Sequence, residues 1–268
     1  MGAVEELLER VQAWARTETN VRAAFVVGSQ ARSETPADEW SDVDVVLLAD
    51  DPARLIEEAD WLGEFGTPQL SFVEETAIGK ERERRVLYEA GVDVDFAIFP
   101  VAALPALLSA PDAARAIARG YLIVHDEIDL EQAFAGRTTE PVGYREPREI
   151  VHDFWYHALW AAKKLRRGEA ITARRCLDSA LNGCLIELAR AHALARRPGA
   201  EVWHSDRFVE RWADPRALDA CWITASSPEE LPGALYRICD AFGALAGELL
   251  PADAGVVAAR RQLADTLG

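Results

Sequence analysis

Two aspartates enter an apolar segment in the pattern Ser41-Asp42-Val43-Asp44. Side chains two residues apart on a strand point to the same face, so Asp42 and Asp44 are expected to share one side. Two carboxylates this close repel each other unless a cation lies between them, and Mg²⁺ binds oxygen ligands of this kind. The pattern therefore predicts a metal site at the start of a strand.

A second acidic pair, Asp93 and Asp95, lies in a later apolar segment with the same spacing. Two-metal phosphoryl and nucleotidyl transfer needs carboxylates that hold the two ions about 3.5–4 Å apart. We expect one residue of this pair to join the first two aspartates. The other is either a solvated residue or a partner for a cationic substrate.

A Gly28-Ser29 pair ends the apolar segment that precedes the first two aspartates. A strand that ends in such a turn presents backbone N–H groups and a hydroxyl to a phosphate. Glycine allows the phosphate to approach the main chain closely. Arg32 follows within the same turn, where it reaches either a phosphate or a nearby acidic side chain.

The charge of the chain is concentrated in its first half. Residues 1–146 carry 29 acidic and 13 basic side chains, whereas residues 147–268 carry 16 of each, so the whole net charge of −16 lies in the first half. Such a field attracts metal ions and cationic ligands, and it argues against nucleic acid as a partner. No apolar run reaches the roughly 20 residues of a membrane span. We expect a cytoplasmic protein, a monomer or weak homodimer.

The elements that must position these side chains alternate between helix and strand in the first half. The expected strands are Ala23–Val27, Val43–Leu48, Gln69–Val73, Arg85–Glu89, Val92–Phe99 and Tyr121–Val124. Helices are expected over Val4–Arg16 and Pro52–Trp61, with short helical segments after Val101. We expect an irregular linker over Asp126–Glu146.

Almost everything after Pro147 has helical periodicity, which predicts a helical bundle. The expected helices are Arg148–Arg167, Ala170–Arg196, Asp206–Ala213, Pro228–Leu250 and Val256–Leu267. The predicted fold class is α+β, with a mixed β-sheet domain and flanking helices over residues 1–146, followed by an α-helical bundle domain over residues 147–268.

The combined motifs resemble the polymerase-β-like nucleotidyltransferase superfamily, and within it the aminoglycoside 6-adenylyltransferases, which adenylylate streptomycin. The segment GSQAR…DEWSDVDVVLL is similar to the opening motif of that family, and YEAGVDVDFAIFP to the hairpin that carries its third carboxylate. Asp153-Phe154-Trp155 and Leu165-Arg166-Arg167-Gly168-Glu169 resemble the start of its helical domain.

This resemblance implies a transfer of AMP from ATP to an aminoglycoside hydroxyl, with two Mg²⁺ ions as cofactors. Asp42 and Asp44 would be metal ligands and Ser29, beside Gly28, would hold the ATP phosphates. Asp95 aligns with the third acid and would be both a ligand and the general base.

The acceptor implied by the resemblance is cationic, and carboxylates bind guanidinium groups well. Candidate contacts are Asp93, together with Glu149 and Asp153, which share a helix face. Trp155 either stacks on the acceptor or belongs to the bundle core. Lys163 either binds the triphosphate or only favours its helix C-terminus.

Alternatives from other classes remain. An enzyme of the same fold would modify another small molecule, a protein or RNA, and a non-catalytic relative would only bind nucleotides.

Overall fold

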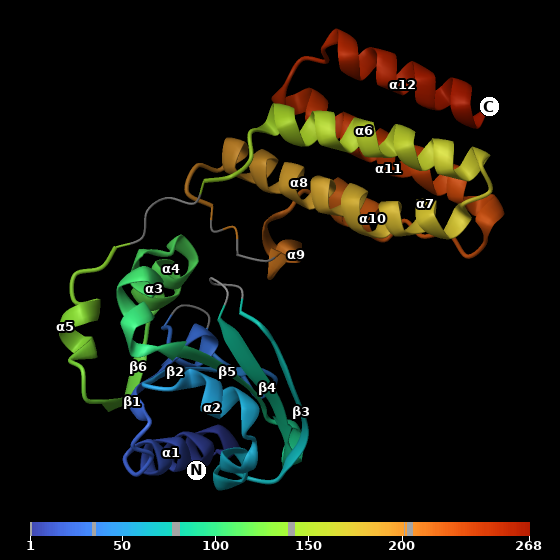
Figure 1. Cartoon of the computed structure of the whole chain (residues 1–268). Coiled ribbons are helices and arrows are strands. Elements are labelled where there is room, and N and C mark those ends of the chain that lie inside the picture. Colours follow the sequence, from blue (N-terminus) through green and yellow to red (C-terminus); the bar gives the residue numbers. More distant parts are fainter. Residues whose placement is uncertain (1, 34–35, 77–80, 139–142, 201, 203–205) are drawn as a thin grey trace. The chain divides into compact units, whose positions relative to one another are not determined.

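The protein is described here by a computed structural model that covers residues 2–33, 36–76, 81–138, 143–200, 202 and 206–268. The chain divides into two compact units, Met1–Pro141 and Val142–Gly268. The first contains all the strands of the described chain and the second is helical (Figure 1). This architecture confirms the predicted α+β class.

The first unit is built on a six-stranded mixed sheet in the order β3-β4-β5-β2-β1-β6. Its strands are β1 (Val21–Val27), β2 (Val43–Ala49), β3 (Pro68–Glu75), β4 (Arg82–Tyr88), β5 (Asp93–Pro100) and β6 (Leu122–Asp126). Its helices are α1 (Ala3–Ala15), α2 (Pro52–Glu57), α3 (Leu104–Ser109), α4 (Pro111–Arg119) and α5 (Leu130–Phe134).

The two central strands carry continuous apolar runs because both of their faces are covered, as expected for strands inside a layered domain. On one face, the helices α1 and α2 pack on side chains that include Val45, Leu47 and Phe96. On the opposite face, α3, α4 and α5 pack on side chains that include Phe25 and Leu48. This opposite face also bears Asp44 and Asp95, because side chains alternate along β2 and β5.

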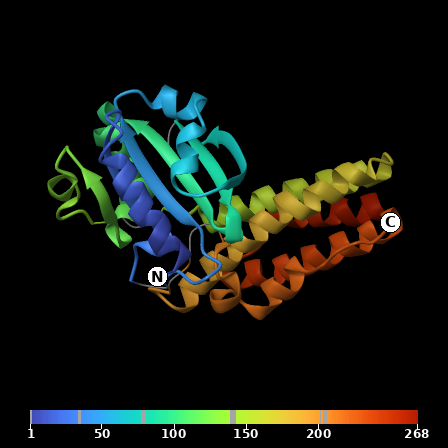
Figure 2. The ribbon, with the colours of Figure 1, turned by 90° about the horizontal axis from the view of Figure 1, so that it is seen from below.

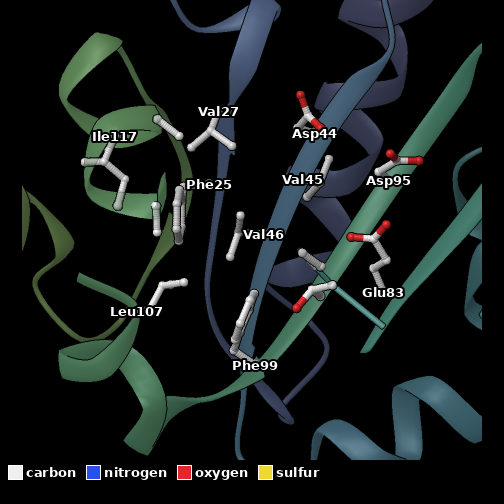
Figure 3. Close-up of a pocket in the computed structure, with 14 residues that line it drawn as sticks. Phe25, Val27, Asp44, Val45, Val46, Glu83, Asp95, Phe99, Leu107 and Ile117 are labelled. Atoms are coloured by element: carbon white, nitrogen blue, oxygen red, sulfur yellow. The ribbon is translucent and has the colours of Figure 1, made fainter. Parts of the chain in front are cut away.

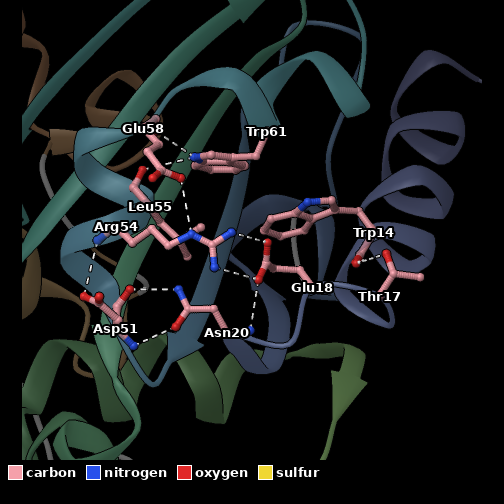
Figure 4. A network of polar contacts seen from close by, with 9 residues as sticks. All are labelled: Trp14, Thr17, Glu18, Asn20, Asp51, Arg54, Leu55, Glu58 and Trp61. Carbon is pink, nitrogen blue, oxygen red and sulfur yellow. Dashed lines mark hydrogen bonds and ion pairs between the residues drawn. The ribbon is translucent and has the colours of Figure 1, made fainter.

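A polar network anchors the ends of β1 and β2 that lie away from the acidic residues (Figure 4). The side chain of Asn20 is 7% exposed; its amide donates to the Asp51 carbonyl (2.8 Å) and its oxygen accepts from the Asp51 N–H (2.7 Å). Arg54 adds an ion pair with Glu18 (3.0 Å). These contacts join the residue before β1 to the loop after β2, and so support the register that pairs Val27 with Asp44.

The second unit is a bundle in which α6 contacts α7, α8, α11 and α12 (Figures 1 and 2). Its helices are α6 (Pro147–Arg166), α7 (Ala170–Cys176), α8 (Asn182–Arg196), α9 (Val209–Trp212), α10 (Pro215–Cys221), α11 (Leu231–Leu249) and α12 (Ala254–Leu267). Phe154 and Phe242 stack at its centre with ring centroids 3.6 Å apart, and both are fully buried.

Several predicted boundaries in the first unit were wrong. The helix expected over Pro52–Trp61 ends at Glu57, because Glu58 is extended and the chain turns to bury Trp61 against Phe96. The stretch predicted to be an irregular linker contains α5, whose Phe134 packs edge-on against Phe25.

The second unit also departs from the predicted helices. The expected helix over Ala170–Arg196 is interrupted by a π-helical turn at Leu177–Leu181. Phe208 has a left-handed backbone, so the helix expected over Asp206–Ala213 begins only at Val209. The sequence analysis missed α10, although Asp214 caps it and Pro215 occupies its first position, a common helix start.

No single helix in the described ranges is both long enough and apolar enough to span a membrane, and only the bent pair Val101–Ser109 and Pro111–Arg119 passes that test, on length and composition alone.

Candidate active site

The three predicted carboxylates converge. Asp42, Asp44 and Asp95 each present a carboxylate oxygen, and these oxygens lie within 4.8 Å of one another. Asp44 and Asp95 are direct neighbours in the parallel pairing of β2 with β5, and their side chains stand together on one face of the sheet (Figure 3). Backbone register therefore brings together residues that are far apart in the sequence.

The Gly28-Ser29 turn lies directly beside these carboxylates. Gly28 follows the last residue of β1 and has a φ of +72°, and a Cβ there would lie 2.1 Å from Asp44 Oδ2. Any side chain at this position would clash with the carboxylate as well as strain the backbone. The glycine thus permits the close approach of the turn to Asp44.

Ser29 is the most distinctive polar residue of the turn. The residue is 4% exposed, and its Oγ has no hydrogen-bond partner among the described residues. A buried hydroxyl without a partner is unfavourable by about 1–3 kcal/mol, so its presence beside the acidic cluster points to a ligand that accepts or donates a hydrogen bond there.

Neighbouring backbone contacts hold the turn in place. Gln30 Nε2 donates to the Asp42 carbonyl (3.3 Å), and the Ala37 N–H donates to the Ser29 carbonyl (3.0 Å). Gly120, at the end of α4, has a φ of +150°, and a Cβ there would lie 2.3 Å from the Ala31 carbonyl oxygen. The end of α4 therefore packs directly on the turn.

Burial and neighbouring charges perturb Asp95. Burial raises the pKa of Asp95 to about 6, Arg85 opposes this rise, and Glu83 and Asp42 add to it. The Arg85 guanidinium lies 3.4 Å from Asp95 Oδ2 and also contacts Glu83 (3.0 Å) and Glu74 (2.6 Å). Arg85 thus provides a positive charge beside Asp95.

The donor set fits a hard divalent cation. Three carboxylate oxygens, from β2, from β5 and from the residue just before β2, match the oxygen-rich coordination of Mg²⁺. The turn beside them also suits a phosphate, because it lies next to the carboxylates and the buried Ser29 Oγ is unpaired among the described residues. The cluster accordingly suits a metal-bound polyphosphate.

Three further predicted site residues lie elsewhere. Arg32 is half-buried just after the turn, and Asp93 is exposed at the start of β5. Lys163 is exposed in the last turn of α6. None of these positions decides between the interpretations that the sequence left open.

The predicted acceptor-binding residues lie on α6 in the second unit. Glu149 is exposed, whereas Asp153 is already paired with Arg145 (2.9 Å) and His157 (2.7 Å). Trp155 is 4% exposed and packs in the bundle core, which favours the second of its two interpretations. The next residue, Tyr156, is 68% exposed and is the accessible aromatic side chain.

Sequence analysis missed Glu83, Arg85 and Gly120. The antiparallel pairing of β4 with β5 places Arg85 opposite Asp95 and Glu83 opposite Ala97, so both side chains face the cluster. The run of four charged residues at the start of β4 is visible in the sequence, but the register of the hairpin is not. In the sequence, Gly120 indicates only the end of a helix and not its contact with the turn.

Comparison with known families decides the assignment. Residues 1–252 match the family model described as streptomycin adenylyltransferase. The chain belongs to this family. Its membership supports nucleotidyl transfer as the reaction.

Solved structures that resemble the chain are distant. An aminoglycoside 6-adenyltransferase from Bacillus subtilis has 14% sequence identity and a TM-score of 0.44, covering 99% of this chain and 98% of that one. A nucleotidyltransferase-like protein from Exiguobacterium sibiricum has 14% identity and a TM-score of 0.34, covering 91% and 75%. A search of curated proteins found no matching sequence.

Proposed function

We propose that this family member transfers AMP from ATP to a hydroxyl group of an aminoglycoside such as streptomycin and releases pyrophosphate. The observation that carries the proposal is the convergence of Asp42, Asp44 and Asp95 beside a glycine-serine turn whose buried hydroxyl lacks a partner. A non-catalytic nucleotide-binding protein would not need a third carboxylate at the cluster.

Ser29 and the main chain of the turn would bind the ATP phosphates. The Ser29 hydroxyl and backbone N–H groups of the turn would be the donors, and Gly28 lets the turn lie close to the Asp44 carboxylate. Asp42, Asp44 and Asp95 would hold two Mg²⁺ ions. When bound, these ions supply charge neutralisation at the phosphates and acidify a nearby hydroxyl.

Asp95 would act as the general base. Its carboxylate stands beside Asp44 on the face that bears the cluster, where it would take the proton of the acceptor hydroxyl. In the metal-free protein, burial raises the pKa of Asp95 to about 6. The acceptor hydroxyl gives its proton to Asp95 while its oxygen forms a bond to the α-phosphorus. The bond to the β-phosphate oxygen breaks, and pyrophosphate leaves with that electron pair.

The proposed acceptor is cationic, because the acidic side chains of the protein recognise positive charge. Asp93 in the first unit, or Glu149 in the second, is an exposed carboxylate that would be a candidate contact for it. Asp153 would have to exchange its present partners for the acceptor, and Tyr156 would stack on a sugar or guanidinium. The use of ATP is consistent with an activity in the cytoplasm.

The test is pyrophosphate release by purified protein with Mg-ATP and a panel of aminoglycosides, lincosamides, proteins and RNA. The expected result is turnover with streptomycin or a related aminoglycoside, and its loss in Asp44→Asn. Asp50→Asn is the matched control, because Asp50 follows the same strand and is exposed. Turnover only with a protein or RNA, ATP binding without turnover, or full activity of Asp44→Asn would contradict the proposal.

A further inference from the structure

A pocket of about 130 Å³ lies within the second unit, where α6, α11 and α12 meet (Figure 1). These three helices and the short loop between α11 and α12 supply all of its lining. The helix α12 begins at Ala254, beyond the residues 1–252 that match the family model. Membership of the family therefore does not by itself imply this pocket.

The inner part of the pocket is apolar. Val151, Trp155, Ala246 and Val256 line it, and each of them is less than a tenth exposed. Gly243 on α11 leaves the space open, because a Cβ there would already lie 3.8 Å from Trp155 Cζ2. The volume is close to that of an apolar cavity of about 150 Å³ that accepts benzene. The inner part thus suits an apolar group of about that size.

The rim of the pocket is cationic. Arg148, His152 and Arg260 line it, and the acidic residue among the described lining is Asp253. The carboxylate of Asp253 is already engaged, since its Oδ1 accepts from the Val256 N–H (2.9 Å). Its Oδ2 contacts His152 Nε2 (2.6 Å) and the Arg148 guanidinium (3.4 Å). Asp253 therefore does not neutralise the third cation of the rim.

That third cation, Arg260, lies over an aromatic ring instead of beside an acid. Its guanidinium carbon is 5.3 Å from the Trp155 ring centroid, and no carboxylate of the described residues lies within ion-pair distance of it. A Cβ at Gly243 would lie 3.7 Å from Arg260 Nη1, so the guanidinium reaches from α12 toward α11 beside the pocket. Stacking on the indole leaves the in-plane N–H donors available to a carboxylate.

This combination limits what the pocket can hold. A small inorganic anion would lose its hydration against the apolar walls, which is unfavourable. An uncharged apolar molecule would leave the Arg260 guanidinium without an acceptor, and a cationic one would be repelled by the rim. Apolar walls with a few polar groups that fix orientation are typical of small-molecule pockets.

We propose that this pocket binds a small organic carboxylate whose apolar body is about the size of a benzene ring. The carboxylate pairs with the Arg260 guanidinium, the geometry in which arginine binds carboxylates best. The apolar body packs against Val151, Trp155 and Val256. The pocket and the acidic cluster belong to different units, so the inference does not depend on the proposed function.

The test is calorimetry on the full chain with benzoate as the probe, and with benzyl alcohol and sulfate as its uncharged and inorganic counterparts. Arg260→Gln removes the unpaired cation, and Arg261→Gln is its control, because Arg261 is the next residue on α12 and is exposed. Gly243→Leu fills the pocket, and Gly233→Leu is its control, an exposed glycine of the same helix. Circular dichroism checks that each variant keeps its helices.

We expect saturable binding of benzoate to the wild type, with benzyl alcohol and sulfate binding at least about tenfold more weakly. Arg260→Gln should weaken benzoate binding about tenfold or more, the scale of a lost charge-assisted hydrogen bond. Gly243→Leu should weaken it by at least as much. The two control variants should bind benzoate as the wild type does.

Several results would overturn the proposal. One is a wild type that does not bind benzoate, and another is sulfate binding as tightly as benzoate. An equal loss of affinity in Arg260→Gln and Arg261→Gln would indicate only a general attraction to positive charge. Unchanged benzoate binding in a folded Gly243→Leu variant would place the probe outside this pocket. None of these results bears on pyrophosphate release, which tests the proposed function separately.

Discussion

Asp95→Asn should stabilise the metal-free protein while abolishing its activity. The carboxyl of Asp95 is 19% exposed, and burial raises its pKa from 3.8 to about 6. Because the pKa of Asp95 is higher in the folded protein than in the unfolded chain, protonation of its carboxyl stabilises the fold. This contribution to the free energy of unfolding is fully present below about pH 3.8 and is lost as the pH rises through about 6. A shift of about 2 units corresponds to about 3 kcal/mol at pH 8.

Asparagine at this position carries no charge, so the free energy of unfolding of the variant should not fall as the pH rises through about 6. The gain should be smaller than the full value, because Arg85 would lose one of its partners while keeping Glu83 and Glu74. We expect the first unit of Asp95→Asn to be more stable than the wild type by about 1–3 kcal/mol at pH 8 and by about zero at pH 4.

The assay is urea unfolding in the presence of a chelator, at several pH values between 4 and 8, followed by tryptophan fluorescence and far-ultraviolet circular dichroism. The second unit is unchanged and supplies an internal reference. Asp93→Asn is the control, since Asp93 is exposed on the same strand, and it should shift the free energy of unfolding by less than about 0.5 kcal/mol. Millimolar Mg²⁺ should stabilise the wild type but not Asp95→Asn.

Equal stabilities of Asp95→Asn and wild type at pH 8 would show that burial of this carboxylate is not unfavourable in the metal-free fold. A difference that shrinks with rising pH would have the wrong sign. Either result would refute the electrostatic description of the cluster.

Three further substitutions test the positioning of the site, and one tests the second unit. Gly28→Ala should lower pyrophosphate release about 100-fold or more, because the new Cβ displaces Asp44; activity within a few-fold of wild type would contradict the close approach. Gly120→Ala should raise the KM for ATP by moving the turn, and unchanged kinetics would rule out that packing role. Asn20→Ala should lower the stability of the first unit by about 2 kcal/mol in urea unfolding, through the loss of two buried hydrogen bonds, and stability equal to wild type would count against the anchor. Phe242→Ala should destabilise only the second unit, by about 3–5 kcal/mol, and a change in the unfolding of the first unit would contradict this.

Much of the site could be predicted from the sequence because it depends on the spacing of residues within short segments. The spacing of Asp42 and Asp44 defines a shared face, and the apolar run that follows defines a buried strand. The spacing alone narrowed the third carboxylate to Asp93 or Asp95, and only the family resemblance favoured Asp95, because the choice depends on the register between β2 and β5. Asp95 pairs with Asp44, whereas Asp93 lies beyond the end of that pairing.

The other features of the site depend on contacts between residues far apart in the sequence, which could not be predicted from one sequence. Arg85 meets Asp95 only through the pairing of β4 with β5, and Gly120 meets Ala31 only because α4 ends against the turn. Trp155 and Tyr156 are adjacent aromatic residues, and only the packing of α6 determines that the first is buried and the second exposed.

The most direct test of the central claim is anomalous diffraction from crystals grown with Mn²⁺ and a non-hydrolysable ATP analogue. The account predicts anomalous peaks bound by Asp42, Asp44 and Asp95, with the phosphates of the analogue at Ser29. Mn²⁺ bound elsewhere, or phosphates that do not contact the Gly28–Gln30 turn, would contradict it.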